Sequence, residues 1–583
     1  MLGLVLVSGA LPFLQAQAQG QPRAGGTMVL AQAISDPPVI AYFVNTADRV
    51  PGSNVFSGLI QQDAAFNPLP DLATNWEFSS DQLTWTFHLV KNATWHDGIP
   101  FTSADVKFSY EELIPLTGDG QIFFSKDDLA RISTPDNYTV VFQWKHPFVE
   151  ALSNMGVFAA PIGPMHLYQG TDYRNNPYNL KPIGTGPFKF QEWIRGDHAT
   201  FVKDEHYFKK GLPYLDKIVF RFISDMASLV SALKAGQVDY FPDGLPYSLV
   251  ADLNKDPNFA PVPLNPTAAG QVVRLAFNLD NPVFQDVRVR RAFSLAVDRQ
   301  TIVDKAAYGY GKVSKSIFTD TPALARYRSP NVPNPKYDPA AAEKLLDDAG
   351  YKRDANGVRS GLGTLRFVTQ TSPPEVYSDP ASLIRDTLKN IGVQVNIVAV
   401  DTGTRLKVMY VDRPRGFDIA INRARTGPTP LFSKKAWTSQ FIQKAIFTNL
   451  GYNNSAIDKL YAQIGVTANA DQLVKLYQQV DEILNNDVPE LWLYDYSYAQ
   501  PRRNTFQGDS FYSIISESGP VEKVWWTQGT PITTTAVTSA ASTKAAQPTG
   551  GMDMTTIGAI VVLIVVVAGA ALYMSKRKKT TPK

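Results

Sequence analysis

The chain has 583 residues, of which 44% are apolar and 19% charged, and its formal net charge is +3. This composition supports a large core and excludes a disordered or low-complexity chain. The sequence contains no cysteine, which excludes thiol nucleophiles, disulfides, Cys-ligated zinc and a lipid-anchor cysteine. Five of the 56 Lys and Arg residues follow Met574, so the preceding 574 residues are close to neutral and lack the basic excess of nucleic-acid-binding proteins.

The N-terminus has the pattern of an export signal. Leu2 to Leu14 is an almost uncharged apolar run, and Ala16-Gln17-Ala18 follows it with the small-x-small pattern of a cleavage site. The basic residues that usually precede such a run are missing. We expect residues 1–18 to be a signal peptide and the remainder of the chain to be exported.

Strand and helix patterns then alternate along the body of the chain. Residues 84–89 alternate between apolar and polar side chains, which predicts a strand with Trp85, Phe87 and Leu89 on one face. A strand at 217–223, a helix that ends at Gly236 and a strand at 238–241 form a predicted βαβ unit. Residues 365–369, 380–391 and 393–398 predict a second one. These units predict α/β lobes built on parallel sheets.

Two further helices are predicted from their caps and apolar stripes. Asp286 is a suitable N-cap for a helix whose apolar residues recur with helical spacing at Val289, Ala292, Phe293, Ala296 and Val297. Asp338-Pro339 begins the next helix, for which Gly350 is the expected C-cap. No repeat with a period of 20 to 50 residues is found in the sequence, which argues against solenoids and propellers.

The sequence contains few patterns typical of catalysis. It has no nucleotide-binding glycine loop, no HExxH, no GxSxG and no EF-hand loop. Its six histidines are scattered singly and lack the spacing of metal ligands. We predict no catalytic residue, no metal site and no cofactor. A pair of carboxylates brought together by the fold stays open as the alternative that would make an enzyme.

The C-terminal part has the pattern of a stalk followed by a membrane anchor. Residues 527–554 are rich in Ser and Thr and predict a flexible stalk. Ile557 to Met574 is uncharged over 18 residues, and it predicts a transmembrane helix over residues 555–575. The basic tail, 576–583, is then cytoplasmic by the positive-inside rule, and the body lies outside the cell on a single-pass anchor. This arrangement, without a lipid-anchor cysteine, favours an archaeal cell surface.

Three N-x-Ser/Thr sequons are candidate glycosylation sites in this exterior part: Asn92, Asn137 and Asn453.

A series of short motifs carries a resemblance that extends over residues 26–526. The motifs occur in the order Leu69-Pro-Asp-Leu-Ala-Thr-Asn-Trp76, Trp95-His-Asp-Gly98, Gly184-Thr-Gly-Pro-Phe188, Ala235-Gly-Gln-Val-Asp239, Asp286-Val-Arg-Val-Arg-Arg-Ala292 and Tyr337-Asp-Pro339. Together they resemble the family 5 extracellular solute-binding proteins of ABC importers, of the dipeptide and oligopeptide type. The glycines in Gly184-Thr-Gly-Pro and Trp95-His-Asp-Gly predict tight turns and close chain crossings, so these motifs specify the scaffold and not the ligand.

The resemblance implies a two-lobed periplasmic-binding-protein-like fold of type II, with a hinge between the lobes and an extra inserted domain. Lobe I would be discontinuous, built from residues 24–50, 185–270 and 497–526. Residues 51–184 would form inserted domain II, and residues 271–496 would form lobe III. The ligand would bind between lobes I and III.

The resemblance also locates a departure from the peptide-binding pattern. Peptide binders of this family commonly hold the ligand's α-ammonium with an aspartate that follows the strand corresponding here to residues 417–422. This chain continues with Arg423-Ala-Arg425-Thr-Gly-Pro and has no acid there. Because guanidinium groups favour carboxylates, phosphates or sulfates, we hypothesise that Arg423 or Arg425 contacts an acidic end of the ligand. The alternative, that both arginines are solvated or paired with surface acids, stays open.

Aromatic residues supply further candidates for ligand contact. The candidate ligand-binding residues are Asn45, Arg423, Arg425, Trp437, Tyr494, Asp495 and Tyr496. The alternation of Tyr494, Tyr496 and Tyr498 also fits a core strand, which is the simpler interpretation for each tyrosine. Asp495 points opposite them and could accept a ligand amine.

The sequence thus predicts a monomeric extracellular receptor that captures di- or oligopeptides and delivers them to ABC permease subunits with a separate ATPase. Two alternatives remain: the same receptor for an oligosaccharide or an anionic solute, and a cell-surface hydrolase. No nucleic-acid partner is predicted.

Overall fold

The computed structural model describes residues 21–37, 39, 49–63, 66–116, 124, 128–157, 159–262, 264–266, 270–425, 429–442, 449–508 and 521–527. The predicted signal peptide, transmembrane helix and cytoplasmic tail lie outside these residues, as does nearly all of the predicted stalk. Within the described ranges, every helix is too short or too polar to cross a bilayer.

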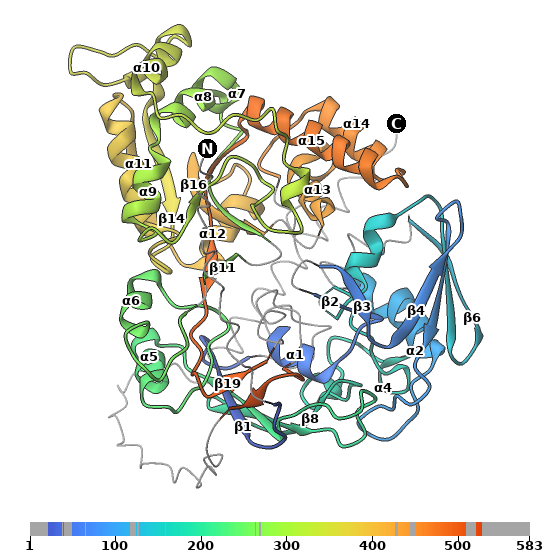
Figure 1. The fold of residues 1–583 in the computed structure, drawn as a ribbon. Coiled ribbons are helices and arrows are strands. Elements are labelled where there is room, and N and C mark those ends of the chain that lie inside the picture. Colours follow the sequence, from blue (N-terminus) through green and yellow to red (C-terminus); the bar gives the residue numbers. More distant parts are fainter. Residues whose placement is uncertain are drawn as a thin grey trace, which may run out of the picture. The chain divides into compact units, whose positions relative to one another are not determined.

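Three sheets organise the described part of the chain (Figure 1). The first has the strand order β1-β10-β9-β8. Its strands are β1 (Thr27–Gln32), β8 (Phe188–Ile194), β9 (His198–Lys203) and β10 (Lys217–Phe222). Strands β1 and β10 pair in parallel, and the other pairs are antiparallel. The helices that follow β10 in the chain are α5 (Met226–Lys234) and α6 (Val250–Leu253).

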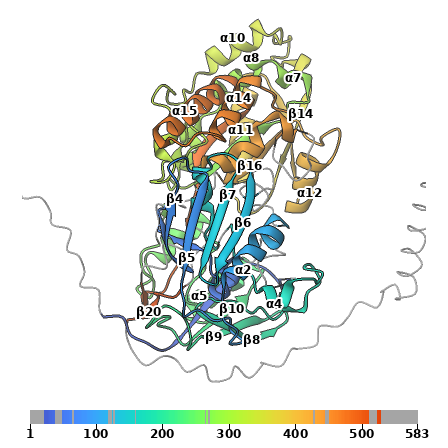
Figure 2. The same ribbon diagram turned by 90° about the vertical axis from the view of Figure 1, so that its right-hand side faces the viewer.

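The second sheet lies in the region predicted as the inserted domain, and Figure 2 shows its strands side by side. Its order is β4-β5-β7-β6, with β4 (Ala73–Phe78), β5 (Thr84–Leu89), β6 (Leu129–Asp136) and β7 (Thr139–Trp144), and all its pairs are antiparallel. Trp85, Phe87 and Leu89 of β5 are buried, which confirms the predicted strand and its inner face. The same part of the chain also forms α1 (Arg49–Val55), β2 (Ile60–Gln62), β3 (Pro68–Pro70), α2 (Ser103–Phe108) and α4 (Met165–Tyr168), of which α2 contacts β6 and β7.

The third and largest sheet has six strands in the order β13-β17-β12-β16-β14-β15. Their bounds are β12 (Gln271–Phe277), β13 (Lys312–Val313), β14 (Thr364–Thr369), β15 (Gln394–Ala399), β16 (Ile419–Arg425) and β17 (Glu490–Asp495). Only the β14–β15 and β14–β16 pairs in this sheet are parallel. The prediction of parallel sheets was therefore wrong for the lobes as a whole, because hydrophobic periodicity identifies a strand without fixing the direction of its partner.

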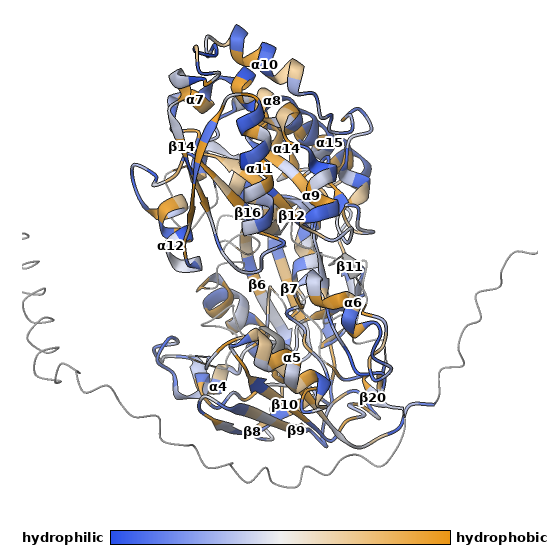
Figure 3. Ribbon diagram, turned by 90° about the vertical axis from the view of Figure 1, so that its left-hand side faces the viewer, coloured by the Kyte–Doolittle hydropathy of each residue, from blue (hydrophilic) through white to orange (hydrophobic). Residues whose placement is uncertain are grey.

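Helices surround this sheet, and Figure 3 shows that α10 and α11 carry both hydrophilic and hydrophobic residues. They are α7 (Pro282–Gln285), α8 (Val287–Ala296), α9 (Arg299–Lys305), α10 (Pro339–Asp348), α11 (Ser378–Asn390), α12 (Thr402–Leu406), α13 (Lys434–Trp437), α14 (Ser455–Ile464) and α15 (Ala470–Asp487). Helix α11 contacts β14 and β15, as expected for the helix of a βαβ unit. Its buried residues include Ala381, Ile384 and Leu388, which recur at helical spacing.

The helix caps follow the sequence closely. The Asp286 side chain accepts a hydrogen bond from the Arg288 amide and caps α8. The five predicted apolar residues of this stripe, Val289 to Val297, are buried. Asp338 caps α10 by accepting from the Ala341 amide. The C-cap of α10 is Ala349, and Gly350 follows it with a φ of 94°, so the prediction was off by one position.

The predicted strand over residues 238–241 is reduced to isolated bridges. Tyr240 bridges Leu30 in parallel and Arg502 in antiparallel orientation. The chain thus returns beside β1 as the βαβ pattern requires, but the contact extends over a single residue. Segments distant in the sequence also pair as β11 (Leu264–Pro266) with β18 (Ser497–Ala499), and β19 (Phe506–Gln507) pairs with β20 (Trp525–Trp526).

Two of the sequence motifs pack directly against each other. The Gly184 amide donates to His96 Nδ1 at 3.3 Å, and the His96 amide donates to the Gly184 carbonyl at 2.9 Å. A Cβ at Gly184 would lie 1.8 Å from the Val55 carbonyl oxygen, so the crossing with α1 requires glycine. The predicted close chain crossing is confirmed.

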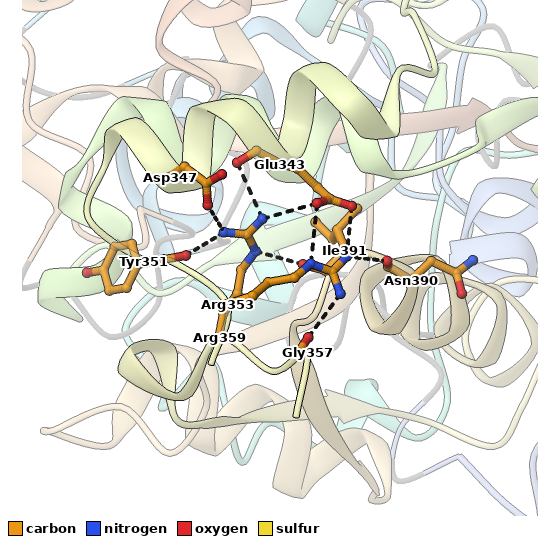
Figure 4. A network of polar contacts seen from close by, with 8 residues as sticks. All are labelled: Glu343, Asp347, Tyr351, Arg353, Gly357, Arg359, Asn390 and Ile391. Carbon is orange, nitrogen blue, oxygen red and sulfur yellow. Dashed lines mark hydrogen bonds and ion pairs between the residues drawn. The ribbon is translucent and has the colours of Figure 1, made fainter. Parts of the chain in front are cut away.

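Arginines tie α10 to the loop before β15 (Figure 4). The Arg359 side chain is fully buried and donates to the carbonyls of Ile391 and Tyr351 and to the Asp347 carboxylate. Arg353 pairs with Glu343 at 2.7 Å. This network has a structural role, since its groups are satisfied by the backbone and by one another.

Each of the three sheets draws its strands from one predicted domain. The residue limits of those domains remain a prediction.

Candidate ligand-binding site

A cavity of about 210 Å³ lies beside the C-terminal end of β16. It is formed by residues of β12, β16 and β17, by α12 and the turn after it, and by α13 with the turn before it. Its lining includes the cations Arg274, Arg405, Arg423 and Lys435, and the aromatic residues Tyr410, Phe432, Trp437 and Trp492. Among the described residues, the lining contains no carboxylate.

A buried ion pair lies at the cavity wall. Arg274 of β12 pairs with Glu490 of β17, and both residues are at most 4% exposed. Burial raises the pKa of the Glu490 carboxyl to about 7, although the charge of Arg274 opposes this shift. The guanidinium of Arg274 lies 5.8 Å from the ring centroid of Trp437. The ion pair thus places the Arg274 guanidinium, whose charge is balanced by Glu490, next to the Trp437 indole.

Arg405 reaches the cavity from α12 and is held by neutral groups. Its Nη1 donates to Asn422 Oδ1 at 2.9 Å, and its Nε donates to the Gln370 side chain. Asn422 in turn donates to the Tyr410 hydroxyl at 2.8 Å. Because these acceptors are neutral, they orient the guanidinium without neutralising its positive charge.

Arg423 connects the cavity to a group of tyrosines. Its guanidinium lies 5.0 Å from the ring of Tyr496 and 5.2 Å from the ring of Tyr498. Tyr496 stacks on Tyr247 with centroids 5.3 Å apart. The tyrosines come from the segment around β18 and from the turn before α6, so Arg423 extends from the large sheet to the strand pair β11–β18.

Glu375 is the second carboxylate near these cations. Its Oε1 accepts from the Tyr247 amide at 3.4 Å, and its backbone carbonyl accepts from the Tyr494 hydroxyl. Burial raises the pKa of Glu375 to about 7, while the charge of Arg423 lowers it.

The structure brings some of the predicted ligand-binding residues together. Trp437 and Arg423 line the cavity, and Tyr496 packs against Arg423. Tyr494 is fully buried, and its hydroxyl donates a hydrogen bond to the backbone carbonyl of Glu375. Asp495 does not line the cavity: its Oδ2 accepts from the Asp320 amide at 3.2 Å, on the other side of the strand.

The remaining predicted residues are described less fully. Arg425 is the last residue of β16, opposite Gln271 of β12. Asn45 lies outside the described residues. Ligand contact by any of the seven residues stays a prediction.

Sequence reasoning missed Arg274, Glu490, Arg405 and Lys435. Arg274 carries a signal, since it is the one charged residue of its strand, and Glu490 begins a strand whose next four residues are apolar or aromatic, so a buried pair could have been expected. Arg405 and Lys435 carry none, because short helices with basic residues are common at protein surfaces.

The three sequon asparagines are all exposed. Asn92 donates a hydrogen bond to the Phe208 carbonyl at 2.9 Å, while no side-chain hydrogen bond of Asn137 or Asn453 is found among the described contacts.

Comparison with known proteins identifies the family. Residues 67–456 match the model of bacterial extracellular solute-binding proteins, family 5, middle region. This match extends over more than half of the chain. The chain belongs to this family.

Relatives of known structure share the fold of this family 5 protein. The oligopeptide-binding protein AppA from Bacillus subtilis is 27% identical over 491 residues, which are 82% of this chain and 88% of AppA. The AppA structure in complex with a nonapeptide aligns with a TM-score of 0.73 at 25% identity, covering 87% of this chain and 100% of AppA.

Two other solved structures hold different ligands. AgaA from A. tumefaciens R10, in complex with agropinic acid, aligns with a TM-score of 0.69 at 27% identity and covers 87% of this chain and 99% of AgaA. NikZ from Campylobacter jejuni, in complex with Ni(L-His), aligns with a TM-score of 0.72 at 26% identity and covers 83% of this chain and 95% of NikZ.

The predicted α/β periplasmic-binding-protein fold is confirmed. The protein is an extracellular solute-binding protein and not an enzyme, so the hydrolase alternative is set aside.

Proposed function

We propose that this protein is the substrate receptor of an ABC importer and that it captures peptides between two lobes. The observation that carries this proposal is the similarity to AppA, which is an oligopeptide-binding protein and whose solved chain aligns over its full length. The receptor delivers its ligand to permease subunits, and a separate ATPase supplies the energy, because the sequence contains no nucleotide-binding loop.

The mechanism follows from ligand-dependent closure. A ligand that contacts both lobes stabilises the closed arrangement by its differential affinity for that arrangement. The cavity beside β16 contributes the lobe III contacts, and the tyrosines around β18 lie where the large sheet meets the β11–β18 pair. Arg423, Trp437 and Tyr496 are the residues proposed to touch the ligand.

A specific observation favours a second candidate, the same receptor role for an anionic solute. Four cations line the cavity, and AgaA binds agropinic acid on the same fold. An oligosaccharide has no comparable support, since sugar rings need no cationic cluster.

The proposed cellular setting is the exterior of a membrane, where residues 555–575 anchor the protein through the stalk and the basic tail faces the cytoplasm. The exposed sequons are proposed glycan acceptors. Mass spectrometry of the native protein reports occupancy at Asn92, Asn137 and Asn453, and extraction with carbonate or detergent reports whether the chain is membrane-integral.

Thermal unfolding of the full-length protein tests the receptor function. Di- to nonapeptides, oligosaccharides and organic acids are added in turn. A ligand that binds only the folded state stabilises it by about 2.7 kcal/mol at a hundredfold excess over Kd, which is a clear shift in Tm. A shift with peptides that remain intact supports the peptide receptor, whereas a shift with organic acids alone supports the second candidate. If no ligand of the panel shifts the Tm, both the peptide receptor and the anionic-solute receptor are overturned.

A further inference from the structure

One short segment of the chain forms a continuous part of the cavity beside β16. It consists of the 3-10 helix Pro430–Ser433 and helix α13, and we call residues 430–437 the wall segment. Its cavity-lining residues are Phe432, Ser433, Lys435, Ala436 and Trp437. Trp437 Nε1 is buried there and has no hydrogen-bond acceptor among the described residues. A ligand oxygen can restore this hydrogen bond, so the position of the wall segment bears directly on ligand affinity.

A carboxylate of the predicted inserted domain holds the wall segment. Glu150 Oε1 accepts a hydrogen bond from the Leu431 amide at 3.3 Å, and Glu150 Oε2 accepts one from the Tyr477 hydroxyl at 2.7 Å. The Glu150 residue is 6% exposed, so both contacts are shielded from water. Among the described residues, none of the inserted domain lines the cavity itself. Glu150 therefore links that domain to the cavity through the first turn of the wall segment.

A second path leads from Glu150 to the wall segment through buried tyrosines. The ring of Tyr477 packs against the ring of Tyr461, with centroids 6.2 Å apart. The Tyr461 hydroxyl shares a hydrogen bond of 2.8 Å with the hydroxyl of Ser433, which lines the cavity. The wall segment is thus fixed at Leu431 directly and at Ser433 through the two tyrosines. Loss of the Glu150 contacts would loosen both points.

The surroundings of Glu150 make its contacts sensitive to pH. The titratable and charged groups that face it are Tyr477 of α15, Tyr461 of α14, Tyr327 with Arg326 bonded to its hydroxyl, and Lys434 of α13. Burial raises the pKa of Glu150 to about 7, although the charge of Lys434 opposes this shift. The protonated acid therefore fits this site better than the carboxylate does, and the hold on the wall segment weakens as the pH rises through about 7.

We propose that Glu150 is a positioning residue through which the inserted domain holds the wall segment and thereby sets the affinity of the cavity for the transported solute. The proposal rests on the proposed receptor function. It gives the inserted domain a part in ligand capture without any contact between that domain and the cavity. A wall that is held before the ligand arrives lowers the entropic cost of binding, so release of the wall weakens the affinity.

Hydrogen–deuterium exchange of the full-length protein without ligand tests the hold on the wall segment. Wild type, Glu150→Gln and Glu150→Ala are compared with one another at pH 5.5 and again at pH 7.5, so the intrinsic pH dependence of exchange cancels. At pH 5.5 we expect equal exchange over residues 429–437 in wild type and Glu150→Gln, and about tenfold faster exchange in Glu150→Ala. At pH 7.5 wild type should exchange at least about threefold faster than Glu150→Gln, because only its carboxyl ionises.

Two controls separate positioning from a general loss of stability. Exchange in α11, residues 378–390, reports opening of the large-sheet body and should be the same in all three proteins at each pH. Glu77→Gln is the matched variant, since the Glu77 side chain is 73% exposed on β4 of the same domain, and it should behave as wild type. Should Glu150→Ala fail to fold, the comparison of wild type with Glu150→Gln still decides. Equal exchange over 429–437 in these two proteins at pH 7.5, or an equal rise in α11, would overturn the positioning role.

Retention of a pool of random tri- to nonapeptides in equilibrium dialysis tests the effect on affinity. We expect wild type and Glu150→Gln to retain equal amounts at pH 5.5, and wild type to bind at least about threefold more weakly at pH 7.5. Equal retention at both pH values would overturn the control of affinity and leave the peptide receptor intact. If no variant retains any peptide, the peptide function is overturned, and hydrogen exchange alone then supports or overturns the hold of Glu150 on the wall segment.

Discussion

The hydroxyl of Tyr477 donates a hydrogen bond to Glu150 Oε2 at 2.7 Å, although the two residues are 327 positions apart. Glu150 lies in a short 3-10 helix, Val149–Asn154, of the predicted inserted domain, and Tyr477 lies on α15 beside the large sheet. The second carboxylate oxygen accepts from the Leu431 amide at 3.3 Å. One buried carboxylate thus joins two parts of the molecule that belong to different predicted domains.

This contact predicts a pH-dependent stability. Burial raises the pKa of Glu150 from 4.5 to about 7, because the neutral acid is favoured in the folded state. The stability that protonated Glu150 contributes is fully present below the pKa of the unfolded state, 4.5. It is lost as the pH rises from there through the pKa of the folded state, about 7. The Gln variant, Glu150→Gln, keeps the shape and stays neutral. Its free energy of unfolding relative to wild type should therefore rise by up to about 3 kcal/mol from pH 4.5 to pH 8.

Urea unfolding of both proteins at a series of pH values measures this difference. Other buried carboxyls titrate in both proteins and cancel in the comparison. Parallel profiles for wild type and Glu150→Gln would show that Glu150 has an ordinary pKa.

A second buried contact between different predicted domains depends on a lysine. Lys209 Nζ lies 2.8 Å from Asp71 and 3.3 Å from Glu522, and both carboxylates are almost fully buried. Lys209→Met leaves these two acids without their cation, so we expect a loss of about 3–5 kcal/mol in the free energy of unfolding. The neighbouring Lys210 is exposed, and Lys210→Met is expected to change stability by less than about 0.5 kcal/mol. Chemical denaturation compares the two, and equal effects would argue against the network.

The crossing at Gly184 predicts a severe steric effect. Gly184→Ala places a methyl group 1.8 Å from the Val55 carbonyl oxygen, which belongs to the backbone and cannot rotate away. We expect a loss of more than about 3 kcal/mol or a failure to accumulate as folded protein. At Gly465 the nearest atom to an added Cβ lies at 3.5 Å, an ordinary contact, so Gly465→Ala should stay within about 1 kcal/mol of wild type. Thermal unfolding of both variants is the measurement.

The arginine network in Figure 4 predicts unequal effects of two similar substitutions. The Arg359 side chain is 0% exposed and that of Arg353 is 32% exposed. Arg359→Met leaves the buried Ile391 carbonyl and the partly buried Tyr351 carbonyl without this donor, so we expect the free energy of unfolding to fall by about 2–4 kcal/mol. In the Arg353→Met variant, water can replace Arg353 at the groups that accept its hydrogen bonds. Its free energy of unfolding should therefore fall by about 1 kcal/mol or less. A larger loss of stability for Arg353→Met than for Arg359→Met would contradict the prediction that the more buried arginine contributes more to stability.

Local elements could be predicted from the sequence because their causes are local. The Asp286 and Asp338 caps, the inner face of β5 and the βαβ unit around α11 follow from capping side chains and apolar periods within about 20 residues. The glycines of Gly184-Thr-Gly-Pro indicated a close crossing without naming Val55 as its partner. The order of these motifs was also sufficient to indicate the family, since the motifs specify the scaffold.

The tertiary structure alone decided strand direction and the charge of the cavity. Antiparallel pairing of β12 with β16 and β17 brings Arg274 opposite both Asn422 and Trp492 and close to Glu490. Arg405 and Lys435 enter the same wall from two short helices with no signal in their own sequence. Such a site depends on contacts between residues far apart in the chain, and no local period or spacing encodes those contacts. The sequence thus determined that this protein captures a solute, and only the packing of distant strands and helices decided which charges line the cavity beside β16.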